Sequence, residues 1–237
     1  MKPLIKKISW VTVFSIAMGF METVVVVYLR KIYYPNGFQF PLVPMETDMA
    51  IIEIMREAAT IIMLFGIGYL AGKTTSQKFA FFIFSFAIWD ISYYIFLKLL
   101  LNWPESLFTW DILFLIPVPW VGPVIAPCIV SLTMIILSYS ILYFHHKSYN
   151  TRIKSLEWWL LTAGSLTVIF SFVWDFLNLL SHDNTNSQPF NLLEKKVEIV
   201  NYIPQDFNYW IFSFGMLIII FGILMFTLRM QRVKNHT

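Results

Sequence analysis

Six long runs of apolar residues follow one another along the chain, separated by shorter stretches that contain most of the charges and prolines. A helix rises about 1.5 Å per residue, so roughly 20 apolar residues cross the ~30 Å hydrocarbon core of a bilayer. Each run is about that long. The pattern therefore predicts an all-α, polytopic membrane helix bundle, a single domain over residues 1–237, with six transmembrane helices at approximately 8–29, 49–71, 79–101, 118–144, 158–180 and 209–228.

Basic residues are divided unequally between the two sides that alternating helices create. Eleven of the 17 Lys and Arg fall in the N-terminus, in the loops after the second and fourth runs, and in the C-terminal tail. Five fall in the opposite loops, and the remaining one, Arg56, lies inside the second run. Because cytoplasmic loops are enriched in Lys and Arg, we expect both termini in the cytoplasm, in a multi-pass protein of the inner (plasma) membrane.

The composition agrees with a bilayer environment and removes several classes of function. Hydrophobic residues make up 58% of the chain and charged ones only 13%, against roughly 25% charged in soluble domains. The single cysteine, Cys128, excludes an intramolecular disulfide and a cysteine-rich metal site. The net charge of +3 comes without a nucleic-acid-binding motif, so no nucleic acid partner is expected. The lipid bilayer is the expected partner, and the sequence is also compatible with a homo-oligomer.

Six ionisable side chains interrupt the apolar runs. Each costs about 2.5 to 3.5 kcal/mol to place at the centre of a bilayer, so it needs a partner, a proton, a metal ion or water. Counted at helical rise from the nearest polar residue of the outer loops, the five acids lie roughly 8 to 14 Å deep. We therefore expect four helices to bring these side chains together near the outer face: Glu22, Glu53, Arg56, Glu57, Asp90 and Asp175.

Arg56 is the only base among these side chains. It lies three residues after Glu53 and next to Glu57, which shares the face of Glu53 at four-residue spacing. One interpretation is a structural ion pair that locks this helix into the bundle. One arginine cannot neutralise five acids, however. The surplus predicts bound protons, a bound cation or both.

Other polar side chains accompany the acids at helical spacing. Tyr93 and Tyr94 follow Asp90 by three and four residues, and Asn178 follows Asp175 by three, so they are candidate binding residues or simply partners of buried acids. Carboxylate-rich sites suit Mg, Mn or non-haem Fe. A divalent metal ion is therefore a candidate cofactor, with ligands drawn from Glu22, Glu53, Glu57, Asp90, Asp175 and His182.

Prolines crowd the start of the fourth run. Pro117, Pro119, Pro123 and Pro127 each lack a backbone donor, which a regular helix needs beyond its first turn. Two interpretations are open: a kinked start to the helix, or a broken, non-helical segment. Irregular backbone at membrane depth is tolerated only against protein or water, so the second interpretation implies a cavity.

Three functions are compatible with this pattern. The first is an acidic pocket near the outer face that binds a cation, or a proton together with a small molecule, in a transporter or a binding component. The second is a membrane-embedded, metal-dependent enzyme that acts on a lipid or another hydrophobic substrate. The third is a structural or assembly subunit whose charges only hold helices together.

Overall fold

A computed structural model describes residues 2–116, 118–182, 203–204 and 206–235. Six helices account for most of these residues, and they are joined by one short hairpin of two strands. In chain order the elements are α1 (Lys2–Tyr33), α2 (Thr47–Ala71), α3 (Thr75–Leu101), β1 (Trp110–Phe114), β2 (Trp120–Pro123), α4 (Ile125–His146), α5 (Ser155–His182) and α7 (Tyr209–Asn235).

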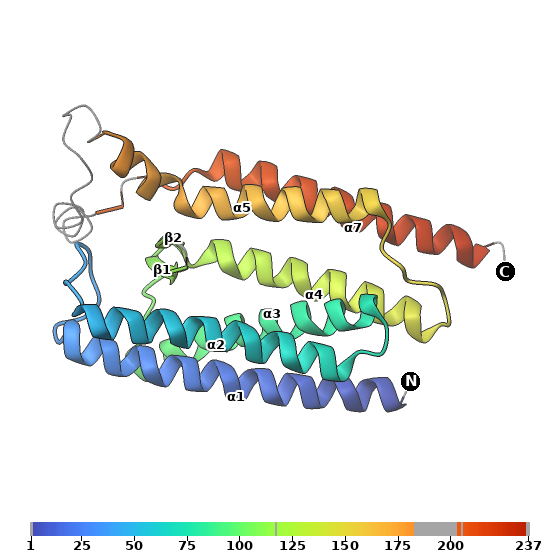
Figure 1. The fold of residues 1–237 in the computed structure, drawn as a ribbon, viewed down its shortest axis with the longest axis horizontal. Helices are drawn as coiled ribbons and strands as arrows, with labels where there is room; N and C mark the ends of the chain where they lie inside the picture. Colours follow the sequence, from blue (N-terminus) through green and yellow to red (C-terminus); the bar gives the residue numbers. More distant parts are fainter. Residues whose placement is uncertain (1, 117, 183–202, 205, 236–237) are drawn as a thin grey trace.

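Five of the described helices are long and apolar enough to cross a membrane: α1, α3, α4, α5 and α7. The remaining helix, α2, has 25 residues and carries the charges of Glu53, Arg56 and Glu57. Each of the six predicted runs overlaps one of these helices. The helices lie side by side, and α1 begins at the end of the bundle where α7 finishes (Figure 1).

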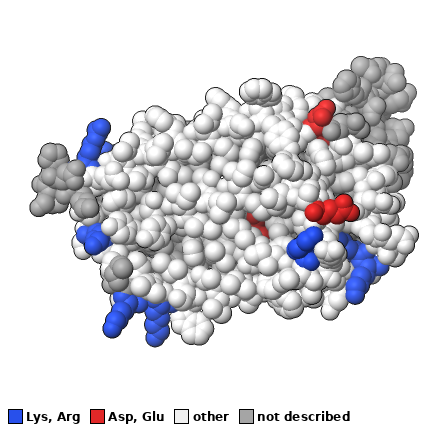
Figure 2. Space-filling view, turned by 180° about the vertical axis from the view of Figure 1, so that it is seen from behind, with Lys and Arg blue, Asp and Glu red and all other residues white. Residues whose placement is uncertain are grey.

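Apolar side chains cover the outside of the bundle, and small polar ones lie inside. Leu70 and Trp210 are 80% and 88% exposed, whereas Ser15 and Thr23 are fully buried. On the face drawn in Figure 2, charged side chains gather towards the two ends, and the surface between them is mostly uncharged. An apolar belt of this kind is the arrangement that hydrocarbon chains solvate well, so the fold supports a membrane protein.

Helices α1 to α4 pack together around α3, which contacts each of the other three. Small residues allow these close approaches. A Cβ atom added to Gly19 of α1 would lie 2.8 Å from the carbonyl oxygen of Trp89, and one added to Gly68 of α2 would lie 2.6 Å from the backbone nitrogen of Phe82. Such contacts are typical of helix pairs in membranes, where packing replaces the hydrophobic effect between helices.

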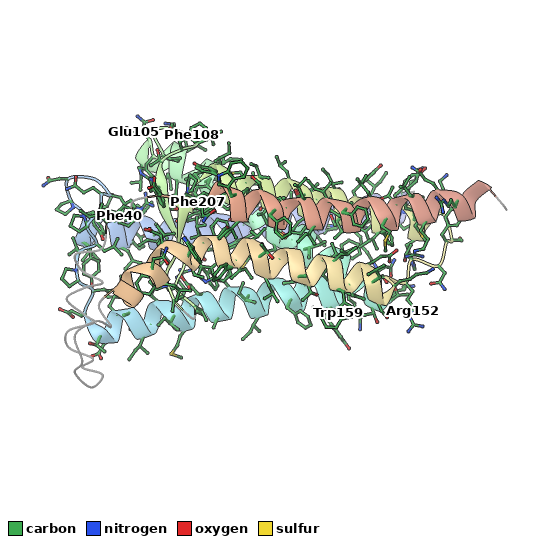
Figure 3. The ribbon with its side chains drawn as sticks, turned by 90° about the horizontal axis from the view of Figure 1, so that it is seen from above. Phe40, Glu105, Phe108, Arg152, Trp159 and Phe207 are labelled. Atoms are coloured by element: carbon green, nitrogen blue, oxygen red, sulfur yellow. The ribbon has the colours of Figure 1, made fainter. Side chains whose placement is uncertain are left out.

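The pair α5 and α7 forms a second layer, with α4 and the hairpin between it and α1–α3 (Figure 1). In the view of Figure 3, Phe207 lies near the hairpin, and its ring centroid is 6.4 Å from that of Trp110 and 5.8 Å from that of Phe172. The ring of Trp120 stacks on Phe172 at 6.2 Å. Aromatic packing therefore connects the hairpin to the second layer.

The predicted all-α class is confirmed, but the hairpin corrects the predicted start of the fourth helix at residue 118. Residues 120–123 form strand β2, which is antiparallel to β1 with Asp111 opposite Gly122, and α4 begins only at Ile125. The physical reason is the missing backbone donors of Pro119 and Pro123, whereas Pro127 is tolerated because it falls in the first turn of α4. The hairpin lies beside the helices, within the length of the bundle (Figure 1).

Candidate functional site

A cavity of about 430 Å³ lies in the half of the bundle away from the N-terminus. Its walls come from α1, α2, α3 and β1, and residues of the connection between α1 and α2 also line it. Much of the wall is apolar, including Val26, Leu29, Leu42 and Ile112. Seven charged side chains line it as well: Glu22, Arg30, Glu53, Arg56, Glu57, Asp90 and Asp111.

Arg56 is the centre of the first group of charges. Its Nε donates to Glu53 Oε1 at 2.9 Å within α2, and its guanidinium also forms an ion pair with Glu22 of α1. The Thr60 hydroxyl donates to the second Glu22 oxygen at 3.3 Å. The predicted pairing of Arg56 with Glu53 is present, and the contact with Glu22 shows that the same arginine joins two helices.

Glu57 has a different partner from its neighbours on α2. Its two carboxylate oxygens accept the backbone N–H of Leu115, at 2.9 and 3.2 Å. Leu115 directly follows β1, so this carboxylate fixes the end of the strand against α2. The described residues between β1 and α4 are thus non-helical and line the cavity at Leu115 and Pro119, in agreement with the second sequence-based interpretation.

Asp90 faces α4 as well as the cavity. The Ser131 hydroxyl of α4 donates to its Oδ2 at 2.7 Å. Tyr93 and Tyr94, the predicted companions, also line the cavity, but the Tyr94 hydroxyl donates to Asp111 at 3.2 Å and not to Asp90. The helical spacing therefore located both tyrosines at the pocket, although it assigned Tyr94 to the wrong acid.

Sequence reasoning missed the ion pair between Arg30 and Asp111, whose Nη2 and Oδ1 are 3.1 Å apart. Both residues were taken for charges of the outer loops, but both are buried. The guanidinium lies between two rings, 3.7 Å from the centroid of Trp103 and 4.4 Å from that of Phe38. Burial raises the pKa of Asp111 to about 6, against the opposing effect of Arg30. The only local signal was an acid within the largely apolar stretch 107–116.

The cavity lining does not include the α5 residues that were predicted to join the same layer, and their place in that layer stays a prediction. Asp175 and Asn178 lie on α5 and are not among the described residues that line the cavity. In the tertiary structure α5 packs on α7 and on β2 of the hairpin. His182 ends α5, and its side chain lies outside the described residues.

The predicted metal ligands do not come together as a metal site in the part of the chain that the structure describes. Within it, no three His, Cys, Asp or Glu side chains form a group that could hold a metal ion. Their oxygens have other partners: Glu22 and Glu53 face Arg56, and Glu57 accepts a backbone N–H. These contacts leave no set of free carboxylates directed at one point, as a divalent ion would require.

No family model, curated protein or solved structure matches this chain. The chemistry of the cavity is therefore the basis for a functional assignment. The cavity has an apolar wall, and Arg56 in it is paired with two carboxylates. Two further carboxylates, Glu57 and Asp90, accept hydrogen bonds from neutral donors.

Proposed function

We propose that this protein crosses the plasma membrane six times with both termini in the cytoplasm, and that its cavity binds a small amphiphilic molecule with a protonated amine. The cavity then opens towards the outer face, and the protein acts as a transporter or as a binding component. The Lys and Arg bias of 11 to 5 supports this orientation. The shared end of α1 and α7 supports an even number of crossings (Figure 1).

The observation that carries the proposal is the charge balance of the cavity. Five acids and two arginines line it among the described residues, an excess of three carboxylates. Arg30 is matched by Asp111, and Arg56 by both Glu22 and Glu53. Glu57 and Asp90 therefore face the cavity without an ion pair to any described lining residue, although the charge of Arg56 also acts on Glu57. A buried carboxylate is stabilised by a proton or by a nearby cation, and an ammonium group supplies both a positive charge and hydrogen-bond donors.

The rest of the wall indicates what the amine is attached to. Apolar side chains form most of the remaining lining, and the volume falls in the range of roughly 300 to 1,000 Å³ that is usual for small-molecule sites. An inorganic cation would leave this apolar surface without a partner. An alkylammonium compound fills it.

Binding of octylammonium, compared with neutral octanol, tests the proposal. We expect calorimetry in lipid nanodiscs to show octylammonium bound at least tenfold more tightly, and Asp90→Asn to remove most of that difference. Asp175→Asn is the matched control, because Asp175 is an acid of a neighbouring helix outside the cavity lining. Equal affinities for the amine and the alcohol would refute the proposal.

One observation favours a second function, a purely structural lock. Arg56 joins α1 to α2 through two carboxylates, and Glu57 joins α2 to the hairpin, so these charges also hold elements together. In that case no ligand is bound. Octylammonium would then neither bind nor raise the melting temperature.

A further inference from the structure

The charges of the cavity form two levels along the bundle. Arg30 and Glu22 are eight residues apart on α1, which corresponds to about 12 Å along the helix axis. On the hairpin, Asp111 lies in β1 and Leu115 directly follows it. Arg30 pairs with Asp111, whereas Leu115 pairs with Glu57. The rise along α1 therefore places the backbone of Arg30 about 12 Å from the level of Glu22, Arg56 and Glu57, which is called the acidic floor below.

The Arg30 level has an unused donor. Arg30 is 7% exposed and lines the cavity, and its Nη1 has no hydrogen-bond partner among the described residues. Buried donors in native proteins are nearly always paired, with protein, with water or with a ligand. Trp89 Nε1 is a second unpaired donor in the lining, but the Trp89 backbone packs on Gly19 of α1, which lies on the Glu22 side and away from Arg30.

The charge of Arg30 is already matched, and this determines what kind of acceptor suits Nη1. Asp111 supplies one negative charge beside the guanidinium, and it is itself only 2% exposed. A second anion would be a buried charge in excess, next to Asp111. An uncharged carbonyl oxygen satisfies the donor without adding a charge.

We infer that the ligand is an amphiphilic amine that carries an uncharged carbonyl group about 12 Å from its ammonium group, with an apolar chain between them. The ammonium lies at Glu57 on the acidic floor, the chain lies along the apolar wall, and the carbonyl oxygen accepts from Arg30 Nη1. This inference rests on the proposed function, because it uses the acidic floor to place the amine. It adds a carbonyl acceptor on the ligand and its distance from the ammonium group, and these two features distinguish one amine from another.

Four compounds that share an alkyl chain separate the two ideas on the wild-type protein: octylammonium, the amide of ω-aminooctanoic acid, ω-aminooctanoate and octanamide. We expect the ω-amino amide to bind roughly three- to tenfold more tightly than octylammonium. Without a partner for its oxygen it would bind more weakly, because a buried amide costs free energy. We expect ω-aminooctanoate to bind no better than the amide.

Each outcome bears on one claim. If the ω-amino amide is no better than octylammonium, or if ω-aminooctanoate is the tightest of the four, the inferred carbonyl is wrong while the proposed amine site stands. If octanamide binds as well as the ω-amino amide, the amine site itself fails. The probe length has its own check: the ω-amino amide of butanoic acid is too short to reach both levels and should lose the advantage.

Two variants assign the acceptor to Arg30. Arg30→Lys keeps a positive charge for Asp111 but removes the second guanidinium donor, so the preference for the ω-amino amide over octylammonium should disappear. Trp89→Phe removes the unpaired donor at the floor and keeps an aromatic ring, so the preference should remain. A preference that is lost in Trp89→Phe and kept in Arg30→Lys would overturn the assignment. The wild-type comparison stands even where Arg30→Lys fails to fold.

Discussion

At the residue scale, Arg56 decides much of the electrostatics of the cavity because it serves two carboxylates at once. Its side chain is 20% exposed, and those of Glu22 and Glu53 are 11% and 8% exposed. Removing one partner of such a poorly hydrated ion pair costs more stability than removing both, because it leaves the other charge buried and unpaired.

Replacing Arg56 with methionine should therefore destabilise the protein by about 3 to 5 kcal/mol, because it leaves two buried carboxylates without their cation. The double variant Arg56→Met with Glu53→Gln should recover part of this loss. Thermal unfolding in detergent measures both. Adding Glu57→Gln to Arg56→Met serves as the control and should recover less, since Glu57 bonds to the Leu115 N–H and not to Arg56. Equal recovery by both second substitutions would contradict the observed pairing.

The sequence identified this group of charges because the insertion cost of each one applies wherever the chain folds. Spacing on one helix also predicted that Arg56 reaches Glu53. The sequence did not predict the ion pair of Arg30 and Asp111, because the two residues are 81 positions apart and lie near the ends of apolar segments. At such positions a charge normally reaches water, but here Phe38 and Trp103 cover Arg30, and Tyr94 donates to Asp111.

At the element scale, the hairpin of β1 and β2 is the non-helical element that contributes to the cavity wall. It lines the cavity with β1 and contacts α5 with β2, so it separates the two helical layers. Irregular backbone in this place needs its polar groups satisfied by protein. The Glu57 carboxylate does so for the N–H of Leu115, and strand pairing does so within β1 and β2.

Replacing Glu57 with leucine should loosen the hairpin, because the Leu115 N–H loses both acceptor oxygens. We expect a loss of about 1 to 3 kcal/mol in stability and faster hydrogen exchange over residues 110–116. Glu57→Gln should stay close to the wild type, because an amide oxygen still accepts the bond. Mass spectrometry of exchanged peptides provides the measurement. Wild-type exchange rates in Glu57→Leu would mean that other contacts hold the hairpin.

At the scale of the whole molecule, charge is placed at both ends and in one internal group. At the other end, the buried Glu157 accepts from the partly exposed Arg229 at 2.7 and 2.8 Å, and this ion pair joins α5 to α7. Since α1 starts and α7 finishes at that same end, its sidedness fixes that of the pocket (Figure 1). Topology is therefore the property of the whole chain that matters most for function.

Thiol labelling in intact cells tests the orientation. In a Cys128→Ser background, a cysteine at the exposed position Glu105, in the connection after α3, should react with a membrane-impermeant reagent. A cysteine at the exposed position Lys73, between α2 and α3, should react only after the membrane is permeabilised. The opposite pattern would place the cavity on the cytoplasmic side and remove the proposed access from outside.

The sequence by itself determined where the helices lie, because a bilayer requires about 20 apolar residues per crossing and makes every buried charge conspicuous. It also indicated that the proline-rich segment is not a regular helix, because proline lacks the donor. Only the tertiary structure decided that this segment forms a hairpin within the bundle, that α5 lies behind it, and that Leu115 and Asp111 meet partners on α2 and α1. These contacts join residues 58 and 81 positions apart, and no periodicity along one helix reports how two distant segments pack.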